Sequence, residues 1–266
     1  MGLVVTILGC GSSGGVPRAG QGWGACDPAE PRNRRRRCSI LVEQTGPSGV
    51  TTVLIDTGPD LREQLIGAGV TRLDAVLYTH DHADHTHGID DLRPIVLAMR
   101  RLIAVHADDI TAATLRQRFG YCFASPPGSD YPPIVDMHEF DPDRPVVIDG
   151  PGGTVTFEPI TVEHGAGYRA FGFRFDNAVY CPDVSLIPPS SRAAFLGARM
   201  IILDALRYTR HPTHLSVDEA LAYLADFAPT QAVLTNLHTD VDYRVLESRL
   251  PGHIAPAFDG MRISLD

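Results

Sequence analysis

A cluster of histidines directly after a short apolar segment constrains this chain more than any other feature. Four of its eleven histidines fall within eight consecutive positions, behind the apolar run Ala75–Tyr78, which predicts a short buried strand. Imidazole nitrogens and carboxylate oxygens are natural ligands of Zn²⁺, Mn²⁺ and Fe²⁺. In an irregular loop after a strand, the spacing H-x-H-x-D-H offers His80 and His82 to one ion, and Asp84 and His85 to a second.

Two simpler explanations of the cluster are a solvated histidine-rich loop and a single structural zinc site. A structural zinc site is usually closed by four ligands, often thiolates, and no cysteine lies near this segment. The spacing therefore favours a metal centre with room for two ions.

The rest of the chain predicts short strands alternating with a few helices. The run Leu3–Leu8 predicts a buried strand that stops at a Gly-rich loop, residues 9–15, and the irregular chain after it does not fit a dinucleotide-binding fingerprint. Segments Ser39–Val42 and Thr52–Ile55 predict a hairpin around the Gly46–Gly49 turn. Further strands are expected at Leu102–Val105, Val146–Ile148, Thr154–Phe157, Phe171–Phe175, Ile201–Leu203 and Ala232–Leu234. Helices are expected after Pro59, from near Asp108, at Val217–Asp226 and at Tyr243–Ser248, with a surface loop at Ser125–Pro133.

Length and composition are those of a globular protein. With 266 residues and 44% hydrophobic residues, the chain is expected to form a single domain, residues 1–266. The net charge of −9 argues against broad capture of nucleic acid, so no stable nucleic-acid partner is expected. Five scattered cysteines, a strand-like beginning and no long apolar run favour the cytoplasm and no membrane partner. A homodimer is compatible with these properties.

The residues Thr79–His85 read T-H-D-H-A-D-H, which resembles the signature of the metallo-β-lactamase superfamily. The resemblance implies an α/β (α+β layered) fold, the αββα sandwich, in which helices flank two mixed β-sheets. It also extends along most of the chain. Asp56 resembles the strand-end Asp that orients the metal loop, His164 the third histidine of the first metal, and Asp183 the carboxylate that bridges the two ions. The implied ligands are His80, His82, His164 and Asp183 for one ion, and Asp84, His85, Asp183 and a last histidine for the other.

That last histidine is where the chain departs from the family. Related hydrolases carry a Thr-His pair at the end of a late strand, whereas this chain has Asn236 after Thr235. In extended backbone His238 points to the same side as residue 236, so we expect His238 to complete the second metal site. The alternatives are that Asn236 completes it, or that His238 is an ordinary surface histidine.

The expected reaction follows from the ligands. Two adjacent ions can hold a bridging hydroxide, because metal binding lowers the pKa of water from about 15.7 toward ~7, and they polarise phosphoryl oxygens. The sequence thus predicts a dinuclear hydrolase with two Mn²⁺ or Zn²⁺ ions, in which the metal ligand Asp84 and the proton donor or phosphate binder His214 serve catalysis. The alternative for His214 is a helix-entry residue beside a capping box formed by Ser216 and Glu219.

Within the superfamily, the chain most resembles the phosphoribosyl 1,2-cyclic phosphate phosphodiesterases. The residues that carry this likeness are His80–His85, Gly88, Asp91–Arg93, Pro212–His214 and Phe258–Met261. It implies a phosphodiesterase that acts on a small, possibly cyclic, phosphate ester or nucleotide. Alternatives are a tRNA-processing type of nuclease and a noncatalytic metal- or nucleotide-binding protein of the same fold. The basic run Arg32–Arg37 is expected to be a solvated loop unless it folds toward the metals and holds a substrate phosphate.

Overall fold

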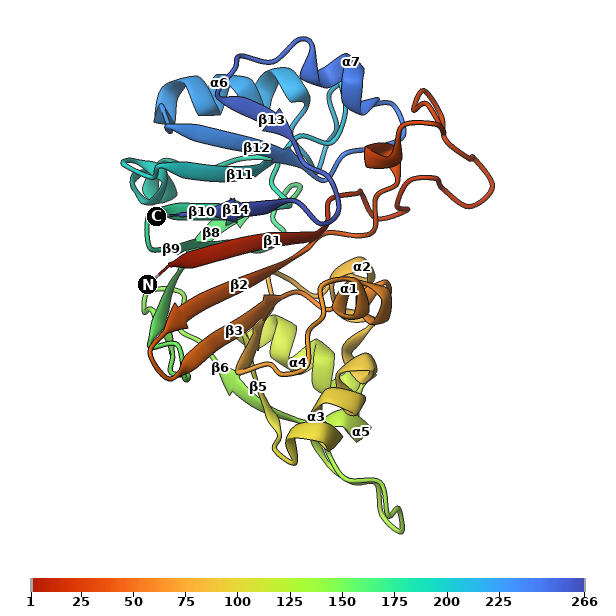
Figure 1. Ribbon diagram of the computed structural model, residues 1–266, viewed down its shortest axis with the longest axis vertical. Helices are drawn as coiled ribbons and strands as arrows, with labels where there is room; N and C mark the ends of the chain where they lie inside the picture. Colours follow the sequence, from red (N-terminus) through yellow and green to blue (C-terminus); the bar gives the residue numbers. More distant parts are fainter. Residues whose placement is uncertain (1, 266) are drawn as a thin grey trace.

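Two seven-stranded β-sheets pack face to face in the computed structural model, which describes residues 2–265 (Figure 1). In the first sheet the strand order is β14 (Arg262–Ser264), β1 (Leu3–Gly9), β2 (Ser39–Gly46), β3 (Gly49–Ile55), β4 (Ala75–Leu77), β5 (Ile103–Ala107) and β6 (Val135–Glu139). In the second it is β13 (Ile254–Pro256), β12 (Gln231–Thr235), β11 (Met200–Asp204), β10 (Ala178–Cys181), β9 (Arg169–Phe175), β8 (Val155–Glu163) and β7 (Val146–Ile148).

Both sheets are mixed, and they are built in the same way. Strands β14, β1, β2 and β3 are antiparallel, and β3 to β6 are parallel. Strands β7 to β10 are antiparallel, and β10 to β13 are parallel. Because parallel strands end at the same edge of a sheet, each half brings several strand ends, and the loops after them, to one place.

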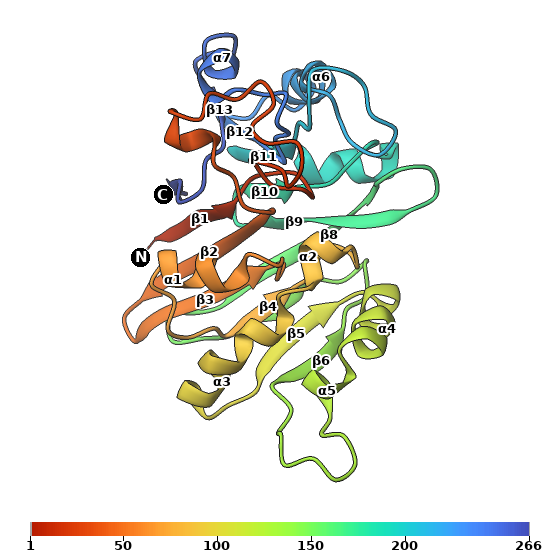
Figure 2. The same ribbon diagram turned by 90° about the vertical axis from the view of Figure 1, so that its right-hand side faces the viewer.

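Helices cover the outer face of each sheet (Figures 1 and 2). On the first sheet lie α1 (Leu61–Gly67), α3 (Arg93–Met99), α4 (Asp109–Arg118) and α5 (Gly120–Phe123), whose apolar residues join one buried cluster with the sheet. On the second lie α6 (Val217–Phe227) and α7 (Tyr243–Glu247), together with the 3-10 helix η3 (Pro189–Phe195). The four layers confirm the predicted αββα sandwich.

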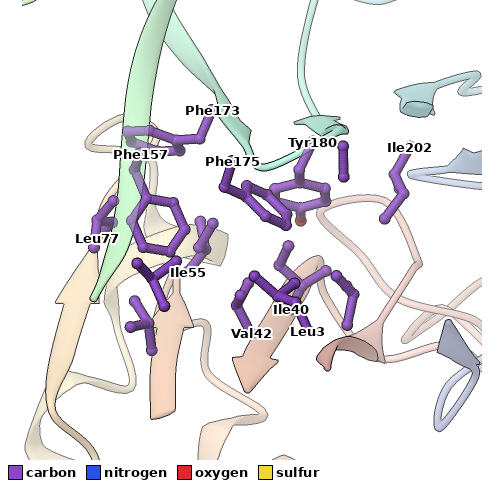
Figure 3. Close-up of a cluster of buried hydrophobic side chains, with 14 of the residues drawn as sticks. Leu3, Ile40, Val42, Ile55, Leu77, Phe157, Phe173, Phe175, Tyr180 and Ile202 are labelled. Atoms are coloured by element: carbon purple, nitrogen blue, oxygen red, sulfur yellow. The ribbon is translucent and has the colours of Figure 1, made fainter. Parts of the chain in front are cut away.

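The space between the sheets is filled by large apolar side chains (Figure 3). The second sheet contributes Phe157, Phe173 and Phe175, and the rings of Phe157 and Phe175 lie 5.3 Å apart. Along β8 buried and exposed residues alternate, because successive side chains of a strand point to opposite faces. This core fixes the two sheets relative to each other, and so fixes the strand ends from which the site is built.

Most of the predicted elements are confirmed. The β2–β3 hairpin lies where the turn predicted it, and α6 begins at Ser216 with the expected capping box, in which Ser216 and Glu219 bond each other's backbone amides. The sequence did not identify seven short elements of three to seven residues each: α2, in the segment expected to be an irregular loop, and α3, α5, β6, β10, β13 and β14. Segments this short show too little periodicity to be predicted, and they form only when neighbouring parts of the chain pair or pack with them. Within residues 2–265 no helix is both long and apolar enough to cross a membrane.

The packing between the sheets generates a prediction for Phe157, which is completely buried. Replacing it with alanine should lower the free energy of unfolding by about 3–5 kcal/mol, because a large cavity would open between two sheets that cannot close over it. Chemical denaturation measures this change. The control is Val147→Ala on β7, where 53% of the side chain is exposed and the cost should stay below about 0.5 kcal/mol. Equal costs for the two variants would contradict the tight packing.

Candidate metal centre

The predicted ligands lie where strand ends of both sheets meet, beside the short helix α2 (Ala83–Thr86), which faces the viewer in Figure 2. From the first sheet, Asp56 follows β3, and the histidine-rich segment begins three residues after β4. From the second, His164 follows β8 and Asp183 comes shortly after β10. The two halves of the sandwich therefore contribute to one centre.

A first group of nitrogen ligands is formed by His80, His82 and His164, whose ligand atoms lie within 4.8 Å of one another. The Nε2 of His164 is 3.3 Å from Nδ1 of His82, while its own Nδ1 lies 2.7 Å from the carbonyl oxygen of Thr213 and donates to it. That second hydrogen bond fixes the tautomer of His164 with an Nε2 lone pair directed toward the other two histidines.

Two linked hydrogen bonds also fix the tautomer of His80. The hydroxyl of Thr79 donates to the Asp56 carboxylate at 2.8 Å, so it accepts from Nδ1 of His80, 3.0 Å away. This leaves a lone pair on Nε2 of His80, a buried atom with no hydrogen-bond partner among the described residues. Burial, followed by the charge of His85, lowers the pKa of His80 well below its usual value, so the ring is neutral. A buried neutral imidazole with a free nitrogen is the form that binds a metal.

The second group joins His80 to His85 and Asp183. Nδ1 of His85 lies 2.8 Å from the Asp56 carboxylate, and Nε2 lies 3.1 Å from Asp183 Oδ2 and 3.5 Å from Asp84 Oδ2. Burial alone would lower the pKa of His85, but the carboxylates around it raise it well above its usual value. Negative charge gathered on this side of the site suits a cation.

His214 forms a third group with His164 and Asp183, whose ligand atoms also lie within 4.8 Å of one another. Its Nδ1 is 2.9 Å from the carboxylate of Asp204, the last residue of β11, and 3.7 Å from Asp183 Oδ1. Burial acts to lower the pKa of His214, but Asp204 and then Asp183 outweigh it and raise the pKa to about 9. The side-chain amide of Asn236 donates to Asp183 Oδ1 at 3.2 Å and to the carbonyl of Pro182 at 3.0 Å. Asn236 therefore orients Asp183.

His238 lies outside the three ligand groups. Its Nε2 is 2.5 Å from a guanidinium nitrogen of Arg18, and its Nδ1 is 3.3 Å from the Asp240 carboxylate. A ring nitrogen that accepts from a guanidinium group has its lone pair engaged. The extended backbone on which the expectation for His238 rested is interrupted at Asn236, whose φ of 61° lies in the left-handed region.

The basic run is mostly built into the structure. Arg35 is 2% exposed and donates to the carbonyl of Val241 at 2.8 Å, while Arg36 pairs with Asp259 at 2.9 Å and Arg37 with Asp60 at 3.1 Å. Arg35 and Arg36 thus join this loop to the C-terminal part of the chain, and Arg37 joins it to the residue before α1. Sequence reasoning missed Asp204, although it follows a predicted strand, and Arg18, for which the Gly-rich loop gave no signal.

The donor set fits a divalent metal. It combines imidazole nitrogens with carboxylate oxygens and no thiolate, a set compatible with Zn²⁺ and with Mn²⁺. The Nε2 atom of His80 is buried and has no hydrogen-bond partner among the described residues, which is costly for a polar atom. A metal ion bound there would supply that partner.

The family follows from this fold and site. A model of the β-lactamase superfamily domain matches residues 51–236, well over half of the chain. The chain therefore belongs to this superfamily and has the metallo-β-lactamase fold, which implies divalent metal ions.

Three relatives match this chain over different shares of their own length. A solved structure described as a new diphosphatase from the PhnP family is 32% identical, with a TM-score of 0.89, and the match covers 100% of this chain and 98% of that one. A protein named octanoyltransferase from Porphyromonas gingivalis (strain ATCC BAA-308 / W83) is 31% identical over 265 residues, or 98% of this chain. The chain spans only about half of that relative, 51% of its length. A ribonuclease Z of Bradyrhizobium diazoefficiens is 42% identical over 64 residues, which are 23% of this chain and 20% of the relative.

The position of Asp56 generates a second prediction. Asp56→Asn removes the carboxylate that holds His85 and Thr79, so the affinity for Zn²⁺ or Mn²⁺ should fall about 10- to 100-fold while the fold is kept. Competition with a chromophoric chelator measures the affinity. Asp136→Asn, at a carboxylate whose side chain is 64% exposed, is the matched control. An unchanged affinity in Asp56→Asn would show that this carboxylate does not organise the centre.

Proposed function

We propose that this chain uses two divalent metal ions to hydrolyse a small phosphate ester, with a phosphodiester as the first candidate. The proposed ligands are His80, His82 and His164 for one ion, Asp84 and His85 for the other, and Asp183 for both. The observation that carries the proposal is the position of Asp183. Its Oδ1 is 3.9 Å from Nε2 of His164 and its Oδ2 is 3.1 Å from Nε2 of His85, so each oxygen faces one group.

Bound divalent ions would lower the pKa of water toward about 7 and polarise phosphoryl oxygens, so no side-chain nucleophile is required. The chain's own residues orient the ligands. Asp56 fixes His85, Thr79 fixes His80, and the carbonyl of Thr213 fixes His164. A centre held in this way loses little energy to reorganisation during the reaction.

His214 is the proposed proton donor to the leaving oxygen. Its Nδ1 is paired with Asp204, whose carboxylate also accepts from the backbone amide of Val184 at 3.0 Å. This pairing leaves Nε2 as the ring nitrogen that can serve the substrate. The ring centroids of His214 and His164 lie 4.6 Å apart, so His214 lies beside the proposed metal ligands.

A diphosphate is the second candidate substrate. Arg18 and Arg207 have no carboxylate partner among the described residues; Arg18 pairs with His238, and Arg207 donates to backbone carbonyls. Both guanidinium groups lie close enough to His238 to affect its pKa, and guanidinium groups bind phosphate well. The similarity to the PhnP-family diphosphatase, at 32% identity, supports the same candidate.

The proposed ligand set predicts different metal contents for two variants. Asp183→Ala should bind well under two equivalents of metal and lose at least about 100-fold in turnover, because both ions lose a ligand. His238→Ala should keep two equivalents, because its ring nitrogen is engaged by Arg18. Elemental analysis after reconstitution measures both. A loss of one equivalent in His238→Ala would assign that histidine to the second ion instead.

The proposed role of His214 is tested separately from metal binding. His214→Gln should lower kcat about 100- to 10,000-fold and keep the metal content of the wild-type protein. With substrates whose leaving group is p-nitrophenolate, which needs little protonation, kcat should fall much less. Loss of a metal ion in this variant would show that His214 is a ligand rather than a proton donor.

The candidate substrate classes are distinguished by measuring the turnover of a panel of substrates, once with Mn²⁺ and once with Zn²⁺. It contains bis(p-nitrophenyl) phosphate, 2′,3′-cyclic nucleotides and adenosine diphosphate, with Asp183→Ala as the control for contaminating enzymes. Turnover of the first two supports the phosphodiesterase, and turnover of the diphosphate alone supports the second candidate. Two bound metals without turnover of any of them would contradict both.

A further inference from the structure

A groove beside the metal centre is not used by the proposed chemistry. It is lined by His82, Ala83, His87, Arg118 and Phe119 and has a volume of about 520 Å³. This volume lies in the range of sites for small molecules, about 300–1,000 Å³. Because the groove shares His82 with the first group of candidate metal ligands, a molecule bound in it would lie beside the proposed centre.

The groove presents an aromatic face. Phe119 lies between α4 and α5 and is half-buried, although its neighbours Leu115 and Cys122 are completely buried. Its ring meets that of His87 edge to face, with the centroids 5.5 Å apart and an angle of 80°. His87 follows α2 and is exposed. The ring of Phe119 is thus held in place by a neighbour and still accessible.

The polar wall of the groove is also held in place. Arg118 donates to the carbonyl of Asp81 at 2.5 Å and lies 3.7 Å from the Asp81 carboxylate. Tyr168 bonds that carboxylate through its hydroxyl and stacks on His82, with the centroids 4.7 Å apart and an angle of 19°. Arg118 keeps further guanidinium hydrogens that can donate to a ligand.

We propose that this groove binds the flat heteroaromatic ring of a substrate, a nucleobase, by stacking on Phe119. This inference rests on the proposed function, because the ring belongs to a molecule whose phosphate lies at the metal centre. A purely apolar group would cover the remaining guanidinium hydrogens of Arg118 without offering them an acceptor, at a cost in free energy. A nucleobase has both a π-face for Phe119 and acceptor atoms at its edge for Arg118.

Calorimetry with adenosine 5′-monophosphate and ribose 5-phosphate tests the inference without turnover. The two ligands share the sugar phosphate and differ in the base. Metal-loaded wild-type protein should bind the nucleotide about tenfold more tightly, and Phe119→Ala should remove this difference while ribose 5-phosphate binds as before. Phe119→Trp should restore it. Tyr121→Ala, at an aromatic residue that is 43% exposed and outside the groove, should behave as wild type.

His87→Ala gives the same test at an exposed position, and it should also reduce the preference for the nucleotide. A preference that is absent in the wild-type protein, or unchanged in both Phe119→Ala and His87→Ala, overturns the inference and leaves the phosphate site standing. Failure of both ligands to bind contradicts the proposed phosphate site, and the nucleobase groove with it.

Discussion

The buried carboxylate of Asp56 is the constraint on which the site depends. It accepts hydrogen bonds from the amide and the hydroxyl of Thr79, each at 2.8 Å, and lies 2.8 Å from Nδ1 of His85. These contacts tie the end of β3 to the segment after β4. Asp56 adopts a φ of 66°, a left-handed conformation that is costly for most residues, and burial raises the pKa of its carboxyl. The surrounding structure offsets both costs. The hydrogen bonds of Asp56 fix the tautomer of His80, through Thr79, and the orientation of His85.

In the second sheet, Asn236 has a position and an orienting role similar to those of Asp56. Asn236 follows β12 as Asp56 follows β3, and it has nearly the same φ, 61°. Its amide orients Asp183, whereas Asp56 orients His85. A carboxylate at residue 236 would face Asp183 across about 3 Å and would repel it, so a neutral amide suits this position. A strand-end carboxylate in the first sheet thus orients an imidazole, and a strand-end amide in the second orients the carboxylate placed between the ligand groups.

Local sequence predicted the parts of the site that depend on local geometry. The segment His80–His85 carries several of the proposed ligands within a few residues, and a preceding strand suffices to place them. The capping box at Ser216 was predictable for the same reason. The environment of His238 was not, because the Arg18 guanidinium that meets it is 220 positions away in the chain. Arg35 was also unpredictable as a buried residue, since its partner Val241 lies 206 positions away.

Two features near the centre bear on the proposed substrate. The segments around α2 and α4 provide the aromatic groove with Phe119. Arg18 and Arg207 both lie close enough to His238 that their charges help burial to lower its pKa. A nucleotide, the proposed substrate, would offer a flat ring to the groove and negative charge to guanidinium groups. The groove and the arginines therefore support the same proposal from independent contacts.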